Sequence, residues 1–305
     1  MNVLHACLLS TATVSLVLSG PARADEMPDN LEKLLPSTEW NIDFGENTCR
    51  LARVFGEGEN KHILFVEQAG PSESFNLTIA GPGMKKYRQI ITRLTLKPDE
   101  GFPQTYGNPA EVVGYGPGEV FTSLKINEPD ESTDGALRTL PHIDLDEAAA
   151  IERVVYGHGG SALSFETGEM ASPFQALNVC SADFVRAWGL DEGEHQSFEK
   201  MAVWKNEADI AKRIQKKYTR AALKRGEQAI LRMRVIVETD GSVSDCTLTD
   251  ATETERLESN ACDEMAKAEF APALDKAGNP MRSFYLTNII YRIFGASADG
   301  TRPRL

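Results

Sequence analysis

A block near the C-terminus, residues 226–294, restricts the fold of this chain more than any other segment. Within residues 229–238, apolar residues occupy every second position, whereas Arg232 and Arg234 fall between them. Successive side chains of a strand point to opposite faces of a sheet. The spacing therefore predicts a half-buried strand with both arginines on its polar face.

A hairpin and a helix are expected next. Asp240 and Gly241 supply the positive φ that a tight turn needs, so residues 243–249 should return antiparallel to the first strand. Thr252 or Thr254 can cap the helix that follows, and acidic residues suit the positive end of its dipole. Its apolar residues recur at helical spacing.

A final β-rich run, residues 284–294, follows a turn at Gly278 and Pro280. The predicted order is strand, strand, helix, strand. An amphipathic, basic helix over residues 208–225 is expected to precede the block. We expect this helix to pack beside the sheet with its lysines in solvent. The alternative is that its basic face binds a membrane surface or nucleic acid.

This block resembles the C-terminal domain of TonB, the periplasmic energy transducer of Gram-negative bacteria. The resemblance covers about residues 205–305 and rests on the order and spacing of several features. They are the hydrophobic strand, the Asp-Gly hairpin, a helix that closes on Phe270-Ala-Pro272-Ala273, the Gly278/Pro280 turn, the last strand, and the Tyr218-Thr-Arg-Ala-Ala222 entry.

The resemblance implies a fold and a mode of binding. It implies a three-stranded antiparallel sheet with a helix across one face, whose final strand offers a free edge over residues 283–293. A segment of an outer-membrane transporter would add to that edge as an extra strand. The candidate binding residues are Tyr285, Thr287, Asn288, Ile289 and Tyr291. Completion of the domain, or a homodimer through this edge, is the alternative.

The preceding segment is expected to be a mostly antiparallel β domain with helices near its end, so the predicted class is α+β. Short apolar runs separated by Gly and Pro predict the strands, at residues 49–55, 62–67, 75–80, 90–96, 120–126 and 161–165. Helices are expected over residues 144–156 and 170–190, and a loose lead-in helix over residues 25–38.

The N-terminus contains a short apolar run that ends in Ala22-Arg-Ala24. This small-x-small pattern predicts a secretory signal peptide, residues 1–24, cleaved between Ala24 and Asp25. An uncleaved anchor facing the periplasm is the alternative. The remaining divisions are expected to be an acidic domain of unassigned role, residues 25–191, a linker, residues 192–204, and the TonB-like domain, residues 205–305.

The four cysteines after the signal are expected to form disulfides, the usual outcome in an exported chain. Cys246 lies in the second strand of the C-terminal block and Cys262 in its helix, so they are paired, which leaves Cys49 with Cys180. The segments around Cys49 and Cys180 also resemble a domain that often precedes TonB-like C-termini. The cysteine spacing does not suit a zinc site.

Charge is uneven along the chain. Residues 25–204 hold 14 basic and 30 acidic residues, whereas residues 205–305 hold 17 and 15. The acidic first part argues against nucleic acid or anionic lipid as its partner, because both carry charge of the same sign.

No strong catalytic pattern is found in the sequence. The histidines after the signal, which are His62, His142, His158 and His195, lie outside any His-x-x-His or His-Glu-x-x-His arrangement. His158 and Ser161 are near one another in sequence, without the Gly-x-Ser-x-Gly elbow of a hydrolase. No catalytic residue, cofactor, metal or small-molecule substrate is predicted.

Three function classes stay open. The preferred one is a periplasmic TonB-like module that binds a protein partner. The others are an exported envelope protein without a transport role and an enzyme whose site lies in residues 25–204.

Overall fold

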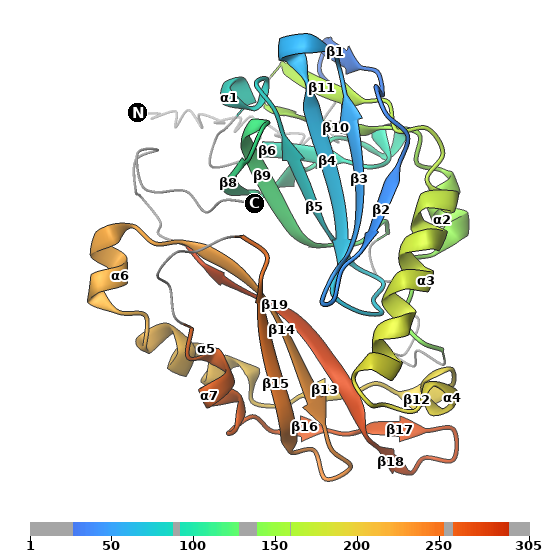
Figure 1. Cartoon of the computed structure of the whole chain (residues 1–305), viewed down its shortest axis with the longest axis vertical. Helices are drawn as coiled ribbons and strands as arrows, with labels where there is room; N and C mark the ends of the chain where they lie inside the picture. The colour runs from blue at the N-terminus through green and yellow to red at the C-terminus, as the bar shows by residue number, and fades with distance from the viewer. Residues whose placement is uncertain (1–26, 88–91, 128–138, 159, 253–258, 293–305) are drawn as a thin grey trace, which may run out of the picture.

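The chain folds as an α+β protein with an N-terminal region of two β-sheets and a C-terminal region built around a three-stranded sheet (Figure 1). The computed structural model describes residues 27–87, 92–127, 139–158, 160–252 and 259–292. The predicted signal peptide and its cleavage site lie outside these residues. Within them, no helix combines the length and the apolar character needed to cross a membrane.

The larger N-terminal sheet is antiparallel throughout, in the order β2-β3-β4-β5-β9-β8. Continuous apolar runs form its centre, and every residue of β5 is buried. Three of the predicted strands, β3, β4 and β5, form an antiparallel meander here, whereas the strand predicted at residues 90–96 is β6 of the second sheet and was not expected there. The strands are β2 (Asn41–Phe44), β3 (Cys49–Phe55), β4 (His62–Gln68), β5 (Phe75–Ala80), β8 (Asn108–Val112) and β9 (Gly116–Leu124).

The second N-terminal sheet has the order β1-β11-β10-β6-β7, with β1 parallel to β11 and the other pairs antiparallel. Its strands are β1 (Asn30–Leu34), β6 (Thr92–Thr95), β7 (Gln104–Thr105), β10 (Val154–His158) and β11 (Ser161–Phe165). Short helical segments connect the strands: η1 (Gly58–Asn60), α1 (Met84–Tyr87), η2 (Pro98–Glu100) and α2 (Leu145–Ala149).

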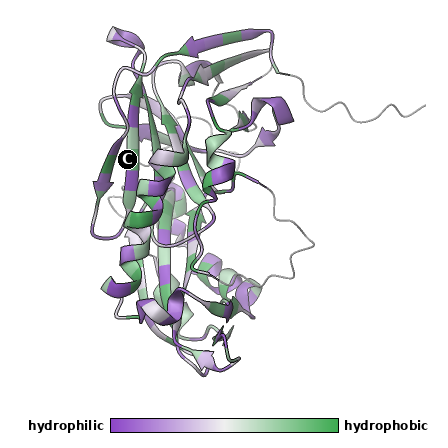
Figure 2. Cartoon of the chain, turned by 90° about the vertical axis from the view of Figure 1, so that its right-hand side faces the viewer, coloured by the Kyte–Doolittle hydropathy of each residue, from purple (hydrophilic) through white to green (hydrophobic). Residues whose placement is uncertain are grey.

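Helix α3 (Ala171–Ala187) closes the core of this region. Phe174 and Leu177 on its inner face join a cluster that contains apolar residues of both sheets. The predicted Cys49–Cys180 disulfide is present and ties β3 to α3, with the two Cα atoms 6.0 Å apart. Figure 2 shows hydrophobic and hydrophilic residues interspersed along the strands, as expected where one face of a strand is buried.

The C-terminal sheet has the order β15-β14-β19 and is antiparallel, as predicted. Its strands are β14 (Ala229–Val237), β15 (Val243–Asp250) and β19 (Ser283–Tyr291). The hairpin turn requires Gly241, because its φ is +84° and a Cβ there would lie 2.2 Å from the Phe270 carbonyl oxygen. Helices α5 (Glu207–Lys216) and α7 (Ala261–Met265) pack with one face of this sheet.

Smaller elements complete the C-terminal region. Strand β13 (Val203–Trp204) pairs with β16 (Phe270–Ala271), and β12 (Phe198–Lys200) pairs with β17 (Ala273–Asp275), which pairs with β18 (Pro280–Met281). The predicted linker, residues 192–204, therefore contains β12, β13 and helix α4 (Glu192–His195). Helix α6 (Arg220–Arg225) follows α5.

Two helix predictions in the N-terminal region were wrong. Asp144 caps α2 as expected, but this helix ends at Ala149 and β10 begins at Val154. Val154, Val155 and Tyr156 favour a strand, and pairing with β6 and β11 buries them. The lead-in helix is also absent from the described residues of that segment, where β1 pairs with β11 instead.

The helix predictions around the C-terminal sheet need two corrections. The basic helix is two helices, because the Thr219 hydroxyl accepts a hydrogen bond from the Ala222 N–H and starts α6. Thr252 does not cap α7, since its hydroxyl accepts from the Ile230 N–H in the sheet. The other predicted cap, Thr254, lies outside the described residues.

Candidate functional site

Strand β19 forms one edge of the C-terminal sheet. Its nine residues pair with β14 along their whole length, from Ser283 opposite Val237 to Tyr291 opposite Ala229. In the described part of the chain, no strand pairs with the other side of β19. Backbone N–H and C=O groups on such an edge are free to pair with an extended segment.

The five predicted binding residues divide between the two faces of β19. Tyr285, Ile289 and Tyr291 pack with the cluster that includes α5 and α7, and alternation places Thr287 on the same face. Asn288 points the other way and is hydrogen-bonded to the N-terminal region. Their role in binding stays a prediction.

A groove of about 400 Å³ runs between α5 and β19, and we call it the apolar groove. Residues 287–291 of β19 and the following Arg292 line one side, and α5 with Trp204 and Tyr218 lines the other. Ile289 and Tyr291 face α5, whereas Ile290, which is 43% exposed, follows Asn288 on the other face of the strand. The groove therefore offers apolar surface directly beside the free edge. Its main apolar lining is Trp204, Ile214, Tyr218, Ile289, Ile290 and Tyr291.

Aromatic rings hold the groove walls in place. The Tyr218 and Tyr291 rings are stacked with centroids 5.5 Å apart, and the Trp204 ring meets Tyr285 edge-on at 5.9 Å. The Tyr291 hydroxyl is hydrogen-bonded to the Ser259 hydroxyl, 2.9 Å away. Burial raises the pKa of Tyr291, which Ser259 partly offsets, and burial with the Glu207 charge raises the pKa of Tyr285. Both phenols therefore stay neutral at physiological pH.

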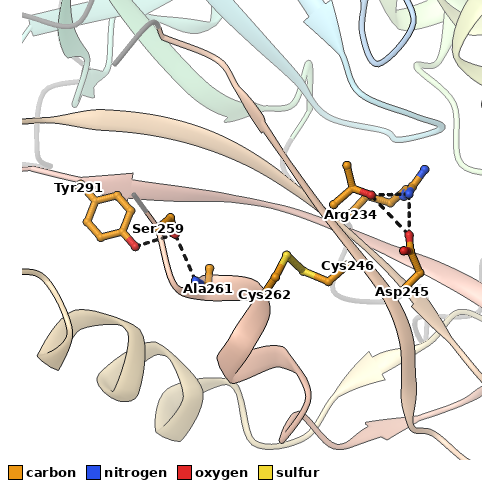
Figure 3. The surroundings of a disulfide bond; sticks show 8 residues. Arg234, Asp245, Cys246, Ser259, Ala261, Cys262 and Tyr291 are labelled. Atoms are coloured by element: carbon orange, nitrogen blue, oxygen red, sulfur yellow. Dashed lines mark hydrogen bonds and ion pairs between the residues drawn. A yellow bond between two sulfur atoms is a disulfide. The ribbon is translucent and has the colours of Figure 1, made fainter. Parts of the chain in front are cut away.

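The predicted Cys246–Cys262 disulfide is present and joins β15 to α7, with the Cα atoms 5.5 Å apart (Figure 3). Figure 3 also shows Ser259, just before α7, between Tyr291 and the Ala261 N–H. Helix α7 is thus fixed to both outer strands of the sheet. A bridge of this spacing contributes about 3 kcal/mol on the chain-entropy model.

The N-terminal region covers the other face of the C-terminal sheet. This contradicts the expectation that Arg232 occupies an exposed polar face, because Arg232 is 7% exposed and pairs with Glu67 of β4 at 2.8 Å. Arg234 is less buried and lies over the Trp188 ring, 5.2 Å from its centroid. The alternating sequence of β14 does not indicate that the N-terminal region packs against the face of the strand that carries the two arginines.

Apolar and polar contacts continue this interface along β19. Phe284 meets the Trp188 ring edge-on at 5.1 Å. Further along the strand, Asn288 exchanges hydrogen bonds with Asn76 and donates to the Ser123 hydroxyl at 3.2 Å. The edge strand is therefore positioned by both regions of the chain.

Histidines in the N-terminal region have structural partners. The buried His62 ring contacts the Asn60 carbonyl oxygen through Nδ1, and its Nε2 accepts from the Gly83 N–H. Burial lowers its pKa, so the neutral ring that this second bond requires is favoured. His158 and Ser161 are cross-strand neighbours in the β10-β11 hairpin. Within the described residues, no group of three metal-ligating side chains is found.

The sequence comparison agrees with the order β14, β15, α7, β19 and with the hairpin between the first two strands. Residues 214–293 form a TonB C-terminal domain. They match the family described as Gram-negative bacterial TonB protein C-terminal, which confirms the resemblance seen in the sequence. No curated protein and no solved structure matches the chain.

The TonB C-terminal domain begins inside α5 and ends just after β19, so it includes the free edge and most of the apolar groove. This family consists of interaction domains that are not enzymes. Strand β13, which supplies Trp204, and the N-terminal region that covers the sheet lie before the match.

Proposed function

We propose that this chain is a periplasmic TonB-like protein-binding module that takes up an extended protein segment along β19. The observation that carries the proposal is the unpaired edge of a nine-residue strand with the apolar groove beside it. The family match supports a role in protein interaction. The periplasmic location rests on the predicted signal peptide.

Strand addition suits this edge on physical grounds. The incoming backbone satisfies the free N–H and C=O groups of β19, while its alternate side chains select the partner. Burial of apolar side chains in the groove stabilises the complex by about 25 cal/mol per Å² of apolar surface removed from water. A short extended segment gains both contributions without any change of the sheet.

The proposed partner is a segment of an outer-membrane transporter, as in the TonB family. The TonB C-terminal domain supports this choice, and the predicted export would bring the two proteins into one compartment. A second copy of the chain, pairing edge to edge, is the competing occupant. An envelope protein without a transport role would use the same edge for a different partner.

Proline substitution in β19 tests the proposal. Neighbouring residues of an edge strand point their N–H groups in opposite directions, so one of Thr287→Pro and Asn288→Pro removes an outward donor. That variant should lose affinity for peptides from transporters and keep its melting temperature. The other variant should break a bond to β14 and lower stability.

Two matched controls separate side-chain from backbone effects. Thr287→Ala and Asn288→Ala keep the N–H groups, and Asn288→Ala reports the loss of the contacts with Asn76 and Ser123. Absence of peptide binding by the unaltered chain would refute the proposal. If the prolines abolish a dimer and no peptide binds, the edge is a self-association surface instead.

A further inference from the structure

A second cavity lies on the opposite side of the same strand and is built mainly by the N-terminal region. It has a volume of about 70 Å³, and we call it the polar cavity. The loop between β4 and β5 forms one wall, and residues 286–288 of β19 form another. Its polar and charged lining is Glu67, Gln68, Ser72, Ser74, Asn76, Ser123, Arg232, Thr287 and Asn288.

The apolar groove and the polar cavity meet at the middle of the edge strand. Both are lined by Thr287 and Asn288. Successive side chains of an added strand point to opposite faces of the sheet. One side chain would therefore enter the groove beside α5, and the next would enter the cavity made by the N-terminal region.

The polar cavity differs from the groove in size and chemistry. Its volume is less than a fifth of that of the groove, which suits a small side chain better than a bulky one. The hydroxyl and amide groups around it can donate and accept hydrogen bonds. Serine and threonine fit these limits, whereas leucine is too large and leaves the polar lining unpaired.

Charge in the wall of the cavity disfavours a cation. Glu67 lies between two guanidinium groups, 2.7 Å from Arg50 and 2.8 Å from Arg232. One carboxylate and two guanidiniums leave one net positive charge. Lysine entering the cavity would meet a like charge.

The wall formed by Ser123 is held in an uncommon backbone conformation. Its φ is +56°, and it lies at an irregularity where the β5-β9 register shifts. The Asn76 side chain accepts from the Ser123 N–H at 3.0 Å, and Asn288 of β19 donates to the Ser123 hydroxyl. A residue other than glycine in this conformation is held there by its surroundings. Here those contacts fix the hydroxyl against the edge strand.

We infer that the N-terminal region is the second wall of the binding site and selects the partner. It favours an extended segment in which bulky apolar side chains alternate with small, uncharged polar ones, serine or threonine. The apolar groove takes the first kind and the polar cavity the second. This inference rests on strand addition at β19.

Designed peptides test the inference. Three nine-residue peptides with identical soluble flanks alternate valine with threonine, with leucine or with lysine. The full chain should bind the valine-threonine peptide about tenfold more tightly than the other two, the effect of one or two lost hydrogen bonds. Fluorescence polarisation measures each affinity.

Variants on the cavity wall assign this preference to the N-terminal region. Ser74→Leu and Ser72→Leu fill the cavity from the N-terminal region, leave the sequence of β19 unchanged, and should reduce the preference for threonine over leucine to about twofold or less. Ser37→Leu, an exposed position elsewhere, is the matched control and should keep the preference. Thermal melting checks that each variant is folded.

The outcomes separate this inference from the proposed function. Suppose that the peptides bind and that proline in β19 abolishes binding, but the unaltered chain does not prefer threonine. Strand addition at β19 would then hold, and the inference that the N-terminal region selects the partner would be wrong. A preference that survives both leucine variants also overturns the inference. Absence of binding by all three peptides overturns strand addition and the inference with it.

Discussion

Glu67 and Arg232 form a buried ion pair, 2.8 Å apart, that joins the N-terminal region to the central strand of the TonB C-terminal domain. Their side chains are 2% and 7% exposed. Arg50 also contacts Glu67, and the Arg232 guanidinium donates to the Asp250 carbonyl oxygen. The two regions are thus connected by an interface and not by the backbone alone.

Replacement of one partner of this pair should be costly. Arg232→Met leaves Glu67 buried with Arg50 as its remaining ion-pair partner, so the loss should stay below the roughly 3–5 kcal/mol of a buried charge left without any partner and exceed the roughly 1 kcal/mol of an exposed pair. Urea denaturation measures the loss. Arg186→Met is the control, because Arg186 pairs with Asp183 and Glu192 where all three side chains are exposed, and each such pair contributes at most about 1 kcal/mol. Equal losses in the two variants would refute a structural role for the buried pair.

Glu119 should make stability depend on pH. Burial raises its pKa to about 7, and the hydrogen bond from Thr92 and the charge of Arg292 only partly offset this. Because the pKa of Glu119 is higher in the folded than in the unfolded chain, ionisation of Glu119 costs folding free energy. The folded state does not bear this cost below about pH 4.5, the unfolded pKa, and bears it fully once the pH has risen through about 7. Glu119→Gln should therefore be more stable than the unaltered chain at pH 8.5, by up to about 3 kcal/mol.

The same pair of proteins should have nearly equal stability at pH 4.5, where Glu119 is protonated and resembles glutamine. Denaturation at both pH values measures the difference. Glu111→Gln, on the paired strand β8, is the control for a general loss of negative charge. A difference between the Glu119 variant and the unaltered chain that does not change with pH would contradict this account.

Local signals explain why the C-terminal sheet was predictable. Alternation in β14 and the Asp240-Gly241 turn act between neighbours in sequence, and they fix the hairpin before any distant contact forms. Once Cys246 and Cys262 are placed on a strand and the helix beside it, their disulfide follows. The family resemblance then supplied the edge strand.

Contacts between distant segments explain what was missed. The burial of Arg232 depends on Glu67, which is far away in sequence and belongs to the other region. The apolar stripe of residues 144–156 suited a helix, but pairing of β10 with β6 and β11 favoured a strand. The polar cavity needs the interface itself, so no single segment indicated it.

Hydrogen exchange along β19 tests the central claim most directly. The experiment follows backbone amides of residues 283–291 by NMR with and without the valine-threonine peptide. Strand addition predicts slower exchange at alternate residues, those with outward N–H groups, while the amides already bonded to β14 stay protected. Unchanged exchange along β19 on saturation with peptide, or new protection on β15 instead, would contradict the account.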